Sequence, residues 1–115
     1  MGGLLDMRVN NSYQLKFDDD FYHPIITGYK VATSRSEPKP IGRGDVIEAL
    51  FKPSDRTLKL EILRHYAIRF EDITSDVAKR EGYVHEDLLK HELKNIYPDI
   101  RPQHYIYIYE FKRIL

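Results

Sequence analysis

Alternating apolar and polar residues divide much of this sequence into short segments that are typical of β-strands. The alternation is clear in residues 12–17, and we also interpret residues 31–35 and 45–51 as strands. A turn at KPSDR separates the third segment from a longer alternating run at 57–70, and HYIYIYEFKRI at 104–114 closes the chain. We therefore predict about five strands.

Start and stop signals predict two or three helices between these strands. FYHPIIT follows the acidic run Asp18–Asp20, which offers N-cap residues, and precedes Gly28, a typical C-terminal stop. SDVAKRE stops at Gly82, and residues 84–97 form an amphipathic pattern that ends before a proline. Because the elements do not alternate as βαβ units, we predict an α+β domain around a small, partly open β-barrel.

The length and charge of the chain narrow the choice of function. Its 115 residues suit a single domain, 1–115, in which we expect residues 1–11 to form a poorly ordered N-terminal extension. Lys plus Arg number 18 and Asp plus Glu number 18, so the formal net charge is zero. That balance argues against non-specific binding of long nucleic acid as the main task.

Composition also bears on cofactors and location. The chain has no cysteine, and its five histidines show no metal-ligand spacing, so we expect neither a metal nor a cofactor. No apolar run approaches the ~20 residues that cross a bilayer, and the start of the chain has no secretory apolar region. We expect a cytoplasmic monomer that does not bind membranes.

Two conspicuous motifs have an ordinary structural interpretation beside a functional one. The last strand carries Tyr105, Tyr107, Tyr109 and Phe111 on one face, which could stack bases, but a strand covered on both faces shows the same pattern. We favour the covered strand. Within GRGD at 42–45, the residues Arg43-Gly44-Asp45 match an adhesion tripeptide, and we interpret them as a turn into the next strand.

The stretch GYKVATSR, residues 28–35, gathers two cations around a hydroxyl. Thr33 and Arg35 lie on one face of an extended chain, and Lys30 joins them only if it lies in the turn after Gly28. Residues 29–43 carry four basic residues and one acidic residue, a local charge of +3. This basic edge favours an anionic or polar ligand, with scattered solvated cations as the alternative.

Glu81 lies at the end of a predicted helix, a position that is unfavourable for a carboxylate. A carboxylate at a helix C-terminus is disfavoured by the helix dipole. The residues three and four positions earlier are Ala78 and Val77, so no intrahelical ion pair compensates. Glu81 is either solvated or positioned for a function.

Taken together, these motifs resemble the ASCH domain family. The resemblance rests on G-x-K-x-x-T-x-R at 28–35, on RFEDIT followed by an Ala and the Glu81-Gly82 pair, on IYP at 96–98 and on the final YEF. It extends from about residue 13 to the end of the chain. Val31, Ala32 and Ser34 depart from the residues that the family often has. The resemblance implies a PUA-like β-barrel of about five strands with two or three flanking helices.

The chain is particularly similar to the small bacterial N4-acetylcytidine amidohydrolases of this family. The resemblance implies that Lys30, Thr33 and Glu81 are catalytic and that the substrate is a small nucleoside. We expect Arg35, Gly28 and Ser34 to contribute to substrate binding.

The resemblance leaves two mechanisms and two functions open. Thr33 attacks the acetyl carbonyl with neutral Lys30 as its base, or Lys30 and Glu81 activate a water while Thr33 positions the substrate. Glu81 protonates the departing amine or orients the attacking group. The alternative function is a non-catalytic module that binds RNA in the same cleft.

Overall fold

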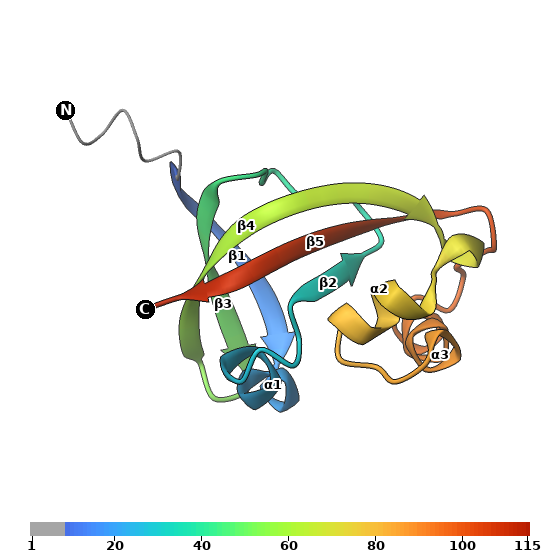
Figure 1. Cartoon of the computed structure of the whole chain (residues 1–115), viewed down its shortest axis with the longest axis horizontal. Coiled ribbons are helices and arrows are strands. Elements are labelled where there is room, and N and C mark those ends of the chain that lie inside the picture. The colour runs from blue at the N-terminus through green and yellow to red at the C-terminus, as the bar shows by residue number, and fades with distance from the viewer. Residues whose placement is uncertain (1–8) are drawn as a thin grey trace.

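The computed structural model describes residues 9–115, which form one mixed, curled sheet with helices at its edges (Figure 1). The strands are β1 (Val9–Asp18), β2 (Ala32–Arg35), β3 (Asp45–Lys52), β4 (Arg56–Arg69) and β5 (Tyr105–Ile114). Their order in the sheet is β1-β3-β4-β5-β2. The β1–β3 pair is parallel and the other three pairs are antiparallel.

Within residues 9–115, three α-helices and two 3-10 turns complete the fold. The turn η2 (Asp19–Phe21) leads into α1 (Tyr22–Ile26), and η3 (Phe70–Asp72) precedes α2 (Ser75–Arg80) and α3 (Glu86–Ile96). In Figure 1, α2 and α3 lie together beyond β2, whereas α1 lies near the ends of β1 and β3. The predicted α+β architecture with about five strands and two or three helices is confirmed.

The alternation read from the sequence places one face of the sheet in an apolar core. In β3, Ile47, Ala49 and Phe51 are buried at every second position, and Leu60 and Ile62 are buried in the same way in β4. They pack in one cluster with residues of β1, α1 and β5. Because the sheet curls around this cluster, its interior resembles that of a small barrel.

The barrel stays partly open, as predicted, because β1 and β2 are the two edges of the sheet. Arg35 of β2 spans the opening: its Nη2 donates a hydrogen bond to the backbone oxygen of Lys16 in β1, 2.9 Å away. The Arg35 guanidinium also lies over the ring of Phe17, 5.0 Å from its centroid. Within residues 9–115, β1 and β2 are not paired with each other, and the Arg35 side chain links these two edges instead.

Strand β5 is covered on both faces. Tyr109 and Phe111 are buried in the cluster inside the sheet. Ile106 and Ile108, on the other face, pack against α2 and α3 in a second cluster. Only the end residue of the aromatic face, Tyr105, is largely exposed, at 52%. The covered-strand interpretation of this segment is therefore confirmed.

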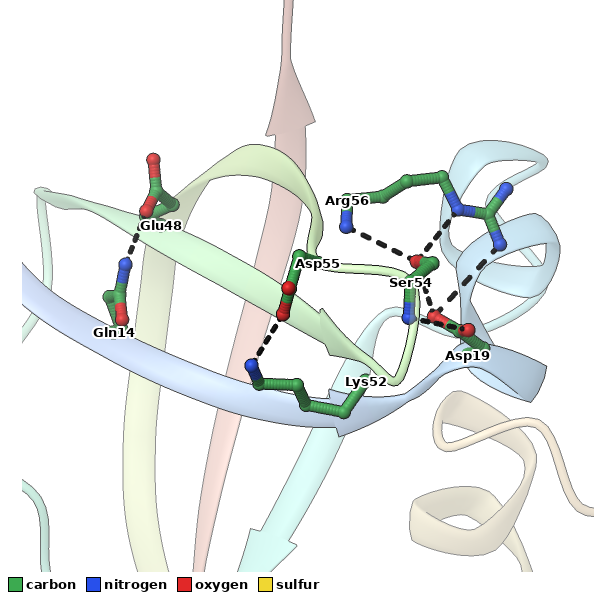
Figure 2. A network of polar contacts seen from close by, with 7 residues as sticks. All are labelled: Gln14, Asp19, Glu48, Lys52, Ser54, Asp55 and Arg56. Carbon is green, nitrogen blue, oxygen red and sulfur yellow. Dashed lines mark hydrogen bonds and ion pairs between the residues drawn. The ribbon is translucent and has the colours of Figure 1, made fainter.

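Polar contacts tie the β3–β4 turn to the segment that follows β1 (Figure 2). Ser54 donates from its backbone nitrogen and its hydroxyl to the carboxylate of Asp19, at 3.0 and 2.7 Å. Arg56 donates to the Ser54 hydroxyl from Nε at 3.1 Å, and its guanidinium lies over the ring of Tyr22. These contacts fix η2 and the start of α1.

The GRGD segment forms a turn, as predicted. The carboxylate of Asp45 accepts hydrogen bonds from the backbone nitrogen of Gly42 at 2.9 Å and from the side chain of Asn11 at 3.2 Å. The bond from Gly42 closes the turn, and the bond from Asn11 ties the turn to β1.

The N-terminal prediction is only partly covered by the structure. Residues 9–11, which the sequence suggested as part of a poorly ordered extension, lie in β1. The rest of the predicted extension, residues 1–8, lies outside the described residues. From Val9 onward, the chain has no helix with both the length and the apolar character that a membrane span requires.

The N-cap of α2 provides a test of how firmly this helix is held. Thr74 accepts a hydrogen bond from the backbone nitrogen of Val77 through its hydroxyl. We expect Thr74→Ala to lower the free energy of unfolding by about 1 kcal/mol, because an orphan N–H loses its partner, and Thr74→Ser to lower it much less. Urea unfolding measures both. Equal losses in the two variants would show that the cap is not the stabilising element.

Candidate active site

A cleft of about 370 Å³ opens between the edge strands of the sheet and α3. The end of β1 with η2 forms one wall, the segment from Lys30 to Arg35 a second, and α3 a third. Glu81 and Tyr83, which follow α2, complete the lining. The cleft is thus assembled from four segments of the chain, which lie within residues 16–21, 30–35, 81–83 and 89–97.

Lys30 enters this cleft from the turn between α1 and β2, as the sequence predicted. Helix α1 ends at a left-handed Gly28, whose φ is 78°, and the backbone nitrogen of Lys30 then donates to the oxygen of Pro24 at 2.9 Å. The Lys30 side chain is only 3% exposed. Its Nζ donates to the backbone oxygen of Glu81 at 3.2 Å and lies 4.7 Å from the ring centroid of Phe21.

Burial makes Lys30 an unusually weak base for a lysine. Loss of hydration lowers the pKa of Lys30 to about 8, the nearby charge of Glu81 opposes this change, and Arg35 adds to it. A lysine with a pKa near 8 is neutral in roughly a tenth of the molecules at pH 7. Lys30 is therefore able to accept a proton at physiological pH.

Thr33 and Arg35 lie on the same face of β2, as predicted from their spacing. Arg35 donates from Nε to the Thr33 hydroxyl oxygen at 3.3 Å. This contact leaves the hydroxyl hydrogen of Thr33 free to be donated elsewhere, and a cationic donor stabilises negative charge on the oxygen. Thr33 is 5% exposed.

Glu81 reaches the cleft as the C-cap residue of α2. Its side chain is 3% exposed and accepts a hydrogen bond from the hydroxyl of Ser34. Burial raises the pKa of Glu81, while Lys30, Ser34 and Arg35 act in the opposite direction. The carboxyl group of Glu81, which the dipole of its own helix disfavours, therefore faces the cleft, where Lys30, Arg35 and the Ser34 hydroxyl interact with it.

The end of α2 is fastened to the sheet just before Glu81 and turns sharply just after it. Before it, the backbone oxygen of Arg80 accepts from Val31 at 2.7 Å, and the Arg80 guanidinium pairs with Glu110 of β5 at 2.7 Å. After it, Gly82 has a φ of 96°. Glycine adopts this left-handed conformation without the strain that other residues would have there.

The structure brings five of the six predicted site residues into the cleft. Lys30, Thr33, Ser34, Arg35 and Glu81 all line it. Gly28 does not: it ends α1 and faces a separate, smaller cavity. Ser34 was expected to contact substrate, whereas the structure pairs its hydroxyl with Glu81.

Sequence reasoning missed the aromatic and apolar walls of the cleft. Phe17 and Phe21 come from β1 and η2, and Tyr83 and Tyr97 flank α3. Tyr97 belongs to the IYP motif already noted, which is the one signal that pointed to it. The others look like ordinary core residues in sequence, because only the curl of the sheet brings them near Lys30.

The loop part of the basic edge lies elsewhere. Neither Lys39 nor Arg43 is among the residues that line the cleft. The backbone of Lys39 is held by the Tyr109 hydroxyl, with a donor–acceptor distance of 2.7 Å. The local charge read from the sequence therefore divides into two cations in the cleft and two on a separate loop.

Solved structures share this architecture. The crystal structure of an ASCH domain from Lactobacillus crispatus matches with a TM-score of 0.72 at 16% identity, over 87% of this chain and 77% of that one. The chain has the fold of an ASCH domain. The resemblance seen in the sequence is confirmed at the level of the fold.

Two further structures have the same ASCH-like fold. The crystal structure of a hypothetical protein, PH0355, gives a TM-score of 0.69 at 14% identity, over 90% of this chain and all (100%) of that one. A DUF984 protein from Enterococcus faecalis gives 0.59 at 17% identity, over 80% and 68%. No family model and no curated protein matches the sequence. At these identities the likeness shows the ASCH fold alone and transfers no activity.

The lowered pKa of Lys30 predicts how stability changes with pH. Its unfolded value is 10.5 and its folded value about 8, so the charged form is disfavoured in the fold. Burial of the charged Lys30 therefore lowers the free energy of unfolding by about 3 kcal/mol below pH 8, and this loss disappears as pH rises toward 10.5. We expect the wild type to gain about 2 kcal/mol relative to Lys30→Met between pH 7.5 and 10, measured by urea unfolding.

Lys79→Met, on the exposed side of α2, is the matched control for the loss of a lysine. The difference between wild type and this control should stay nearly constant over the same pH range. A constant difference for Lys30→Met as well would contradict the buried, weakly basic lysine.

Proposed function

We propose that this protein is an amidohydrolase that removes the acetyl group from N4-acetylcytidine or a related acylated nucleoside. The observation that carries the proposal is the meeting of Lys30, Thr33 and Glu81 in one cleft, with the pKa of Lys30 lowered to about 8. A hydroxyl, an amine with a lowered pKa and a buried carboxyl group that line one cleft form a set that supports acyl transfer. The identity of the acyl compound comes from the sequence resemblance.

In the first mechanism, Thr33 is the nucleophile. Its Oγ1 bonds to the acetyl carbon while the hydroxyl proton passes to neutral Lys30, and Arg35 stabilises the charge that develops on the oxygen. The carbon–nitrogen bond then breaks, and the exocyclic amine takes a proton from Glu81. Water cleaves the acetyl ester on Thr33, so that the products are cytidine and acetate.

In the second mechanism, water is the nucleophile. Its oxygen bonds to the acetyl carbon while Lys30 or Glu81 takes one of its protons, and Thr33 donates a hydrogen bond to the substrate. The carbon–nitrogen bond then breaks, and the proton passes from that base to the exocyclic amine. The two mechanisms use the same three residues and give the same products. They differ in whether an acetyl group is ever bound to the protein.

The lining of the cleft supports a nucleoside as the substrate. Its volume of about 370 Å³ lies in the range of small-molecule sites, ~300–1,000 Å³. Aromatic rings and the leucines of α3 offer an apolar surface to a base. The three basic residues of the lining are matched by three acidic residues: Lys16, Lys30 and Arg35 against Asp18, Glu81 and Glu92. A cleft without excess positive charge suits a ligand that carries no phosphate. We also propose that the protein is a cytoplasmic monomer.

The direct experiment is to incubate the protein with N4-acetylcytidine and to follow cytidine release by chromatography. Thr33→Ala, Lys30→Ala and Glu81→Gln should each remove nearly all activity. If the three act as a unit, combining two changes should cost little more than one. Thr57→Ala, an exposed threonine on β4, is the matched control and should remain active.

Thr33→Ser separates the role of the hydroxyl from that of the threonine shape, and it should retain measurable turnover. Full activity in Thr33→Ala would exclude Thr33 as the nucleophile. Full activity in Lys30→Ala would remove the assigned base, and absence of turnover in the wild type would refute the proposed reaction.

Binding of RNA without catalysis is the alternative, and salt dependence separates the two. A free nucleoside has no phosphate, so Lys39→Ala and Arg43→Ala should leave turnover unchanged and turnover should vary little with salt. If the ligand is RNA, each lost phosphate contact should flatten the plot of log affinity against log salt by roughly 0.7. Measurable RNA affinity with that flattening, and no turnover, would favour the binding module.

A further inference from the structure

Ser34 is a buried polar residue of the cleft that neither mechanism above uses. Its side chain is 8% exposed, and its hydroxyl donates to Oε2 of Glu81. A hydroxyl already engaged with a buried carboxyl group is poorly placed to bind substrate as well. The contact joins β2 to the end of α2, across 47 residues of sequence.

The period of two along β2 explains why Ser34 meets Glu81. Ala32, two residues earlier, packs with Val77 and Ala78 of α2 in the second apolar cluster. Ser34 therefore faces the same side as α2, whereas Thr33 faces the opposite side. The strand pairing with β5, in which Ser34 lies opposite Ile108, holds this geometry in place.

We propose that Ser34 is a positioning residue that holds the carboxyl group of Glu81 in one orientation before and after proton transfer. This inference rests on the role that the proposed function gives to Glu81. A hydroxyl donates its hydrogen to a carboxylate and, after rotation, accepts one from a carboxylic acid. Ser34 thereby satisfies both protonation states of Glu81 without adding charge to the cleft.

The other groups that face Glu81 do not supply this restraint. Lys30 donates to the backbone oxygen of Glu81, so it fixes the main chain of that residue. Arg35 and Tyr83 interact with the Glu81 charge through space. The restraint on the carboxyl group therefore comes from Ser34, through its hydroxyl and through a hydrogen bond from its backbone, and Ser34→Ala removes the hydroxyl part alone.

The kinetic test compares Ser34→Ala with Ser34→Thr. Loss of the restraint should lower kcat by about 100-fold, because small misplacements of a reacting group have effects of that size, with KM changed less than twofold. The limb of the pH profile that belongs to Glu81 should move to higher pH, since the Ser34 hydrogen bond favours the charged carboxylate. Ser34→Thr keeps a hydroxyl and should recover most of kcat and the original limb.

Ser36→Ala is the matched control, because Ser36 follows β2 and lies outside the cleft lining. It should leave kcat and the pH profile unchanged. A Ser34→Ala enzyme with wild-type kcat and an unmoved pH profile would overturn the inference. Equal losses in Ser34→Ala and Ser34→Thr, with no shift in pH dependence, would overturn it too and would indicate a packing role.

A second readout does not depend on turnover. Carboxyl ¹³C NMR of Glu81 reports its titration directly in the wild type and in Ser34→Ala. We expect the midpoint to rise in Ser34→Ala, and an identical midpoint in the two proteins would overturn the inference. If the wild type does not hydrolyse N4-acetylcytidine, the proposed reaction fails, whereas the NMR result still decides whether Ser34 controls Glu81.

Discussion

The burial of a lysine and a glutamate in one cleft is the constraint on which the site depends. Lys30 and Glu81 are each only 3% exposed, and loss of hydration disfavours the charged form of both. Their mutual attraction offsets part of this cost, and Ser34 stabilises the carboxylate further. The pKa of Lys30 therefore falls and that of Glu81 rises. Burial thus moves both pKa values toward neutral pH, which is the direction that the proposed proton transfers need.

The scaffold holds this unfavourable pair by contacts outside the cleft. Arg80, the neighbour of Glu81, is bound to Glu110 of β5 through its side chain and to Val31 through its backbone. Arg35 joins the two open edges of the curled sheet and also contacts Thr33. The same side chains that stabilise the partly open barrel therefore set the positions of Thr33 and Glu81. A site held at a local cost in stability is the usual pattern in enzymes.

Local patterns predicted the elements well, and long-range contacts explain what they missed. Gly28 and Gly82 marked two helix ends correctly because both adopt positive φ. The two-residue period correctly placed Thr33 and Arg35 together. The partnership of Ser34 with Glu81 was missed because it joins residues far apart in sequence. Phe17 and Phe21 reach the cleft only through the curl of the sheet, which no local signal specifies.

The titration of the Lys30 amine tests the central claim most directly. NMR detection of its ¹⁵Nζ, assigned by comparison with Lys30→Met, gives the pKa in the folded protein without any assumption about substrate. Burial beside Arg35 predicts loss of the proton near pH 8. A midpoint at or above the ordinary value of 10.5 would contradict the account, because Lys30 would then stay charged and could not act as a base at physiological pH.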